Sequence, residues 1–160
     1  MIRKMLLVSV ILGAAAPALG QATIDPSRAI GLTPDQIQWK KGEANDTAWP
    51  VGDPTKPGLC LELIKWHPNH FSHPHFHGHA RYAVVIDGTW WVSTSNVYDE
   101  KATYPVRAGT VAIDKANTVH WDGARQGEKE PAVLELVGMG PVKTIQVDEN
   151  GKPKPTPPSR

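Results

Sequence analysis

The chain has 160 residues, which is enough for one domain of ordinary size but too few for two. Its 17 Lys and Arg residues nearly balance its 16 Asp and Glu residues, so it lacks the basic excess of a nucleic-acid-binding protein. The 14 Gly and 15 Pro argue against a helical bundle and favour a turn-rich, mostly β chain. With a single cysteine, Cys60, the chain can form no intrachain disulfide.

Residues 1–20 have the pattern of a secretory signal peptide. Arg3 and Lys4 supply positive charge, an apolar run continues to Ala16, and small residues precede Gln21. The apolar run is shorter than a comfortable membrane span, and the sequence has no second one. We therefore expect cleavage before Gln21 and a secreted or periplasmic bacterial protein that is not membrane-bound afterwards.

Short β-type runs separated by turn residues follow an expected leader over residues 21–38. The predicted strands are 58–66, 82–86, 89–94, 104–114, 132–137 and 143–147. The Asp87-Gly88 dipeptide between two of them suits the tight turn of a hairpin. Strands this short and this closely spaced predict a single small all-β barrel or sandwich over 39–147. A disordered Pro-rich tail is expected over 148–160.

Histidine is distributed very unevenly. Six of the seven histidines lie between His67 and His79, and the seventh is His120. Side chains at i and i+2 of a strand point to the same face, so His75 and His77 can chelate one ion from inside a barrel. A third ligand must then come from a distant strand, and His120 is the histidine available for this. This pattern predicts a metal site.

The spacing resembles the two motifs of the cupin superfamily, G-x5-H-x-H-x3-4-E-x6-G and G-x5-P-x-G-x2-H-x3-N. The residues at motif spacing are His75, His77, Arg81 and Gly88 for the first motif, and Gly109 and His120 for the second. The chain resembles small single-domain secreted bacterial cupins of the type-2 kind. This resemblance implies a double-stranded β-helix, or jelly-roll barrel.

Several positions depart from the cupin pattern. Arg81 stands where the family usually has a metal-binding Glu, and at the longer spacing that position is Tyr82, again not a carboxylate. In the second motif Lys115 replaces Pro, Asn117 replaces Gly, and Ala124 replaces the final Asn. Asn tolerates a left-handed backbone, so the turn of this motif can still form. The resemblance therefore implies a histidine site without its usual carboxylate.

Three ligand sets are open. In the first, His75, His77 and His120 bind the ion and water fills the remaining positions. In the second, His79 is a fourth imidazole ligand in place of the missing Glu. In the third, His73 pairs with His75, and His79 lies four positions further on; this set breaks the first-motif spacing and ranks last. We favour the first set, with His79 as an optional fourth ligand. The histidines expected in a solvated loop are His67, His70 and His73.

Arg81 has two interpretations, which the sequence leaves open. Its guanidinium group could hold a substrate carboxylate or enolate beside the metal. Alternatively, it could pair with Asp87 or Asp114 and close the mouth of the barrel. The neighbouring Tyr82 is expected to be a core aromatic residue.

Imidazole ligands without a carboxylate suit one divalent transition metal ion, which could be Fe, Zn, Cu, Ni or Mn. A neutral ligand set leaves the charge of the ion uncancelled and favours a small anionic or oxygen-rich substrate, with Arg81 as its clamp. The cupin resemblance implies dioxygenase-type chemistry at such a site. The alternatives are a non-catalytic periplasmic metal- or small-molecule-binding protein and a zinc-dependent hydrolase or isomerase. The sequence does not give the oligomeric state; because cupins commonly pair through barrel strands, the resemblance is compatible with a homodimer.

Overall fold

The computed structural model describes residues 31–155; the predicted signal peptide and most of the predicted leader lie outside the described residues. Within this range the helical segments are two 3-10 turns, η1 (Pro34–Gln36) and η2 (Glu100–Ala102). The strands are β1 (Asn45–Val51), β2 (Gly58–Trp66), β3 (His70–Phe71), β4 (His75–His77), β5 (Arg81–Asp87), β6 (Thr89–Ser93), β7 (Tyr104–Arg107), β8 (Val111–Asp114), β9 (Trp121–Ala124), β10 (Ala132–Gly140) and β11 (Thr144–Gln146). No helix among the described residues is long and apolar enough to cross a membrane.

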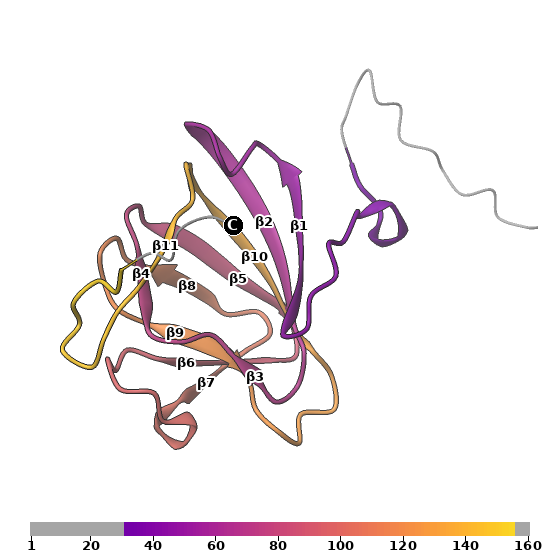
Figure 1. The fold of residues 1–160 in the computed structure, drawn as a ribbon. Coiled ribbons are helices and arrows are strands. Elements are labelled where there is room, and N and C mark those ends of the chain that lie inside the picture. The colour runs from indigo at the N-terminus through magenta and orange to yellow at the C-terminus, as the bar shows by residue number, and fades with distance from the viewer. Residues whose placement is uncertain (1–30, 156–160) are drawn as a thin grey trace, which may run out of the picture. The chain divides into compact units, whose positions relative to one another are not determined.

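The strands form two facing antiparallel sheets and one short ladder (Figure 1). The five-stranded sheet has the order β1-β2-β10-β5-β8, and the four-stranded sheet has the order β3-β9-β6-β7. Strands β4 and β11 pair with each other at one side of the two sheets (Figure 1). The all-β jelly-roll architecture expected from the sequence is therefore confirmed.

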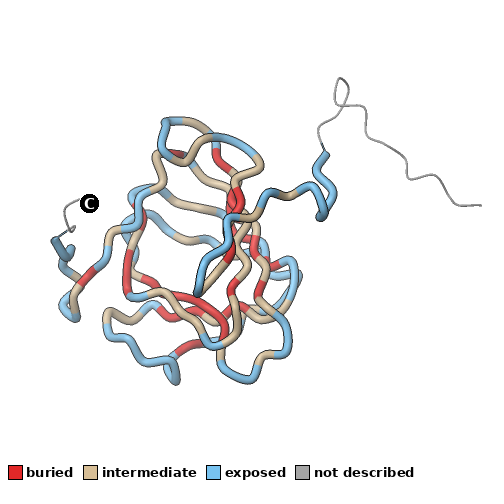
Figure 2. The backbone as a smooth tube through the Cα atoms, turned by 45° about the vertical axis from the view of Figure 1, so that its right-hand side comes forward, coloured by how far each residue is buried: buried red, intermediate tan, exposed pale blue. Residues whose placement is uncertain are grey.

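The hydrophobic core lies between the two larger sheets. Trp66, Val85 and Leu134 project into it from the five-stranded sheet, and Trp90 and Val92 from the four-stranded sheet. Buried positions lie mainly along the strands, whereas the connecting loops are largely exposed (Figure 2). Burying aliphatic and aromatic side chains of this size contributes about 1.5–3 kcal/mol each, so this cluster is the main source of stability.

The outer face of the five-stranded sheet is more apolar than the sequence interpretation allowed. In β5, Ala83 and Val85 point inward and are almost fully buried, so alternation turns Tyr82 outward. Tyr82 is 58% exposed and lies opposite Ile113 of β8, which is 57% exposed. The prediction that Tyr82 belongs to the core was therefore wrong, because the pleat places it on the other face.

The prediction of a hairpin at Asp87-Gly88 was also wrong. Strand β5 ends at Asp87 in one sheet, and β6 begins at Thr89 in the other, so the chain crosses between the sheets at Gly88. Gly88 has φ +71°, and a Cβ atom there would lie 2.5 Å from the Pro131 carbonyl oxygen. The predicted strand 104–114 divides in the same way, into β7 and β8 of different sheets. A turn signal is local and does not specify which sheet the next strand joins.

The first part of the expected disordered tail is hydrogen-bonded to the domain. The Asp148 amide donates to the Lys152 carbonyl oxygen, and the Lys154 amide donates to the Gln146 carbonyl oxygen of β11. Val147 and Pro153 form a β-bridge. Residues 148–154 thus turn back against β11, which differs from the sequence expectation.

Candidate metal centre

Strand β4 sets the first two histidines of the site. His75 and His77 point inward and are buried, while Phe76 between them is half-buried and pairs with Ile145 of β11. The period-2 alternation of a strand places the two imidazoles on one face, as the sequence predicted.

His120 is brought to this pair by backbone pairing with His75. The amide of each residue donates to the carbonyl oxygen of the other, at 2.9 Å in both directions. Asn117, just before it, has φ 56°, and its amide donates to the His77 carbonyl oxygen at 2.8 Å. Asn accepts this left-handed conformation at little cost, so the second-motif turn forms without its usual Gly.

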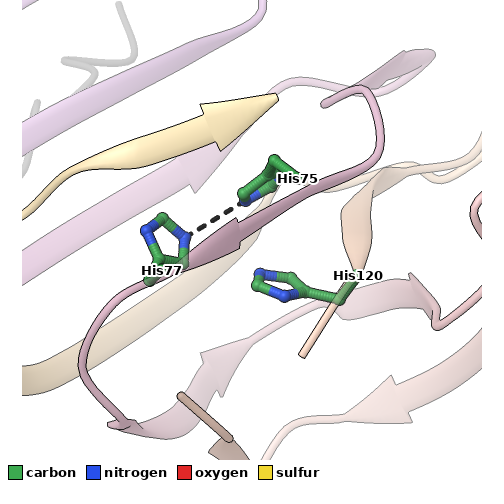
Figure 3. A group of neighbouring side chains, drawn as sticks. All are labelled: His75, His77 and His120. Carbon is green, nitrogen blue, oxygen red and sulfur yellow. Dashed lines mark hydrogen bonds between the residues drawn. The ribbon is translucent and has the colours of Figure 1, made fainter. Parts of the chain in front are cut away.

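The three imidazoles converge on a common space (Figure 3). The Nε2 atoms of His75 and His77 are 3.1 Å apart. His120 faces both rings, and one nitrogen from each of the three side chains lies within 4.8 Å of the others. All three residues are buried, which excludes most competing contacts with bulk water.

Backbone carbonyl groups orient the three rings. The Nδ1 atom of His75 lies 2.7 Å from the His73 carbonyl oxygen, and that of His77 lies 2.9 Å from the Lys143 carbonyl oxygen. The Nδ1 atom of His120 lies 3.1 Å from the Thr118 carbonyl oxygen. Because a carbonyl can only accept, each ring carries its proton on Nδ1 and presents the Nε2 lone pair. Hydrogen bonds of this kind fix the orientation of metal-binding histidines.

Two of the imidazoles, those of His75 and His77, are held in the neutral form that binds metals. Burial is the main cause that lowers the pKa of His75, and neighbouring His120 adds to it. Burial, followed by the charge of Arg81, lowers the pKa of His77 to about 2. A neutral ring offers its Nε2 lone pair at any pH in the physiological range.

The residues present fit a transition metal ion. Nitrogen–metal bonds are about 2.0–2.1 Å long, so two nitrogens 3.1 Å apart can reach the same ion. Two unprotonated nitrogens this close repel each other unless a cation lies between them. Three imidazoles without a coordinated carboxylate suit Zn, Cu, Ni or Fe better than Mg or Ca.

His79 does not join the cluster. Strand β4 ends at His77, and Gly78 and His79 form an exposed turn, so strand alternation no longer aims the side chain inward. His73 is also exposed and packs against Tyr98, with ring centroids 5.2 Å apart. The histidine cluster is thus the first of the three predicted sets, and the structure corrects the expectation of His79 as a fourth ligand.

His67 and His70 also lie apart from the cluster. Their rings contact each other edge to face at 6.2 Å, and His67 Nε2 lies 3.2 Å from the Asp46 carboxylate. Both residues are partly exposed, in agreement with the expected solvated segment.

Arg81 pairs with Asp114, one of the two partners that the sequence interpretation considered. Its Nε and Nη2 atoms lie 2.9 and 2.8 Å from Asp114 Oδ2. Its Nη1 atom lies 3.5 Å from Glu62 Oε2, and its Nη2 atom lies 2.7 Å from His77 Nε2. Arg81 therefore faces the histidine cluster as well as the ion pair.

A cavity of about 330 Å³ opens beside His75, His77 and Arg81. Two carboxylates line it, Glu62 of β2 and Asp122 of β9. Burial raises the pKa of Glu62 to about 7, although the charge of Arg81 opposes the shift. Glu62 can therefore hold or release a proton near neutral pH at the wall of the cavity.

Asp122 and Trp66 have different roles in the cavity wall. Asp122 accepts hydrogen bonds from Trp90 Nε1 and Ser72 Oγ, both at 2.8 Å, so it ties three segments together. Trp66 Nε1 is buried and has no hydrogen-bond partner within residues 31–155. An unpaired buried N–H is costly, and the Trp66 side chain also lines the cavity.

Sequence reasoning missed Glu62, Asp122 and the position of Asp114 beside the cluster. In β2 the leucines at 59, 61 and 63 share the outer face, and Glu62 shares the inner face with Cys60 and Trp66. The strand did contain a signal for Glu62, because Glu62 and Trp66 are an even number of positions apart and therefore share one face. The leucines made the opposite face look like the buried one.

Neither a family model nor a curated protein matches the sequence. Solved structures do match its fold. The polyketide cyclase RemF from Streptomyces resistomycificus is 14% identical with a TM-score of 0.58, covering 77% of this chain and 89% of that one. An RmlC-like cupin from Shewanella frigidimarina is 14% identical with a TM-score of 0.52, covering 68% of this chain and 87% of that one.

A third match is a protein with a double-stranded β-helix domain from Klebsiella pneumoniae. It is 17% identical with a TM-score of 0.54, covering 69% of this chain and 90% of that one. Identities this low establish the fold alone. The chain thus has the cupin fold that its motifs indicated.

Proposed function

We propose that this cupin-fold protein is a metal-dependent enzyme that acts on a small anionic or oxygen-rich molecule. Its ligands for one divalent transition metal ion are His75, His77 and His120. The observation that carries the proposal is the convergence of these three buried imidazoles, two of which, His75 and His77, line a cavity. A bound ion supplies Lewis-acid polarisation and lowers the pKa of coordinated water.

The cavity wall provides the contacts that a small substrate needs. Arg81 presents a guanidinium group, which binds carboxylates through paired hydrogen bonds. Glu62 is an acceptor or, when protonated, a donor. A cavity of about 330 Å³ is at the lower end of the range for small-molecule sites, so the substrate is small.

Two reaction classes share this site. Dioxygenase-type chemistry is the class implied by a cupin site with three histidines and no coordinated carboxylate. Metal-assisted proton transfer, as in an isomerase or a cyclase, is the second, and Glu62 favours it because its pKa near 7 suits a general acid–base group. The fold match to a polyketide cyclase is compatible with this second class.

We also propose that the protein acts in the periplasm or outside the cell. The signal-like pattern of residues 1–20 supports this location. The metal would then be acquired there, from whatever ions that compartment provides.

The proposal is tested by isolating the protein from the compartment in which the cell places it and measuring its metal content by mass spectrometry. We expect one transition metal ion per chain. The loaded protein is then incubated with a panel of small hydroxy and keto acids in D₂O, while O₂ uptake and deuterium incorporation are followed. O₂ uptake identifies the dioxygenase, and deuterium incorporation without O₂ uptake identifies the proton-transfer enzyme. Stoichiometric metal without either would favour a metal carrier, and absence of metal would refute the proposal.

A further inference from the structure

Arg81 and a metal ion require the same atom of His77. Arg81 Nη2 lies 2.7 Å from His77 Nε2, which is hydrogen-bonding distance. His77 Nδ1 already donates to the Lys143 carbonyl oxygen at 2.9 Å, so Nε2 is the acceptor nitrogen of this ring. Arg81 cannot lose its proton in a protein, so it is the donor of this hydrogen bond.

A single lone pair cannot serve both partners. An imidazole nitrogen has one in-plane lone pair, and a metal bond of about 2.0–2.1 Å along that direction occupies the space in which the Arg81 N–H lies. The guanidinium charge would also face the charge of the ion at close range, which is unfavourable without an intervening anion. Metal ligation by His77 therefore requires Arg81 Nη2 to leave.

We propose that Arg81 is a resident cation of the metal-free site, which an incoming metal ion must displace from His77. The assignment of His77 as a ligand rests on the proposed function. Arg81 thus lowers the affinity of the site for metal and makes the bound ion exchangeable. It is a positioning residue, since it acts through His77.

The surrounding acidic groups explain why a cation occupies this place. Asp114 holds Arg81 through Oδ2 from β8, and its Oδ1 atom lies 3.3 Å from His120 Nδ1. Glu62 faces the guanidinium group from β2 at 3.5 Å. Arg81 is the cation that pairs with these buried carboxylates when no metal is bound.

Displacement changes what Arg81 can do. Its Nε contact with Asp114 at 2.9 Å does not involve His77, so the side chain can stay anchored while Nη2 moves. Arg81 lines the same cavity as Glu62 and Trp66, so N–H groups released from His77 are next to that space. An anionic ligand could pair with them, so metal binding would prepare the site for such a ligand.

The test compares Zn²⁺ affinity by isothermal titration calorimetry in wild type, Arg81→Met and Lys115→Met. Lys115 is exposed and follows Asp114, so Lys115→Met removes a neighbouring positive charge without touching His77. Hydrogen bonds to charged groups have strengths that correspond to about 10- to 100-fold in affinity. We expect Arg81→Met to bind Zn²⁺ about 10- to 100-fold more tightly and Lys115→Met to change affinity less than about threefold. Equal or weaker binding by Arg81→Met, or equal gains in both variants, would overturn the proposal.

A second measurement uses the wild-type chain and does not depend on a variant that folds. In ¹⁵N-labelled protein without metal, we expect a coupling across the hydrogen bond between Arg81 Nη and His77 Nε2. It should vanish at one equivalent of Zn²⁺, while the His77 Nε2 signal moves to the position of a coordinated nitrogen. A coupling that persists with Zn²⁺ bound would contradict displacement. If neither wild type nor Arg81→Met binds Zn²⁺, the proposed function fails; tight binding by Arg81→Met alone would uphold the competition.

Discussion

Removing the imidazole of His120 tests the metal centre most directly. His120→Ala retains the amide and carbonyl groups that pair with His75 at 2.9 Å, so the substitution removes a ligand and leaves the backbone link intact. Loss of a residue that merely supports a ligand weakens metal binding by about 10- to 100-fold. Loss of the ligand itself should therefore cost at least about 100-fold.

The consequence for stability can be estimated. At a free Zn²⁺ concentration about 1,000 times the wild-type Kd, binding stabilises the native state by about 4 kcal/mol, but a variant weakened 100-fold gains only about 1.4 kcal/mol. For a domain of this size, each kcal/mol shifts Tm by about 3–5 °C. The Zn²⁺-induced rise in Tm should thus fall from about 12–20 °C in wild type to about 4–7 °C or less in His120→Ala.

Differential scanning calorimetry with and without Zn²⁺ measures this rise separately for each variant, so any loss of stability in the metal-free variant cancels. His70→Ala is the control, because its ring contacts His67 and not the cluster, and its Zn²⁺-induced rise should equal that of wild type. If His120→Ala kept the full rise while His73→Ala or His79→Ala lost it, the ion would bind in the histidine-rich loop, and the assignment of the metal centre would be refuted.

Other predictions concern the cavity, the fold and processing. Burial raises the pKa of Glu62 from 4.5 to about 7, so the contribution of its protonated form to folding stability is complete below pH 4.5 and is lost as pH rises through 7. Between pH 4.5 and 8.5, the free energy of unfolding of wild type, measured with urea, should therefore fall by up to about 3 kcal/mol relative to that of Glu62→Gln. Gly88→Ala should destabilise the fold by about 1–3 kcal/mol, because φ is +71° and its Cβ would meet the Pro131 carbonyl oxygen. Gly127→Ala, with φ +93° and open space around the Cβ, should cost less in the same assay, and equal costs would mean that the sheet crossing tolerates a side chain. Intact-mass measurement of the exported protein should give a chain that begins at or near Gln21, and retention of Met1 to Gly20 would count against a periplasmic location.

The sequence alone was sufficient for the fold class, and it favoured His75, His77 and His120 while leaving His79 open as a fourth ligand. Strand alternation placed His75 and His77 on one face because the period of a strand is two, whatever the rest of the chain does. The spacing from Gly109 to His120 identified the third histidine, because Asn117 can adopt the left-handed conformation that this turn needs. The strand period and the turn at Asn117 depend on residues close together in the chain, whereas the meeting of His120 with His75 depends on a β-bridge between distant segments.

Contacts between distant strands determined the rest. Local signals could not show that Arg81 meets Asp114 and His77, that Glu62 lines the cavity, or that Tyr82 faces outward. Each of these depends on which strand lies opposite which: β5 pairs with β8, and β2 turns its Glu62 face inward. The position of His79 could not be predicted from the spacing of the histidines either. Strand β4 ends at His77, and His79 beyond it is exposed to solvent. Pairing and packing over long sequence separations fix these positions, and a pattern read along one strand does not contain that information.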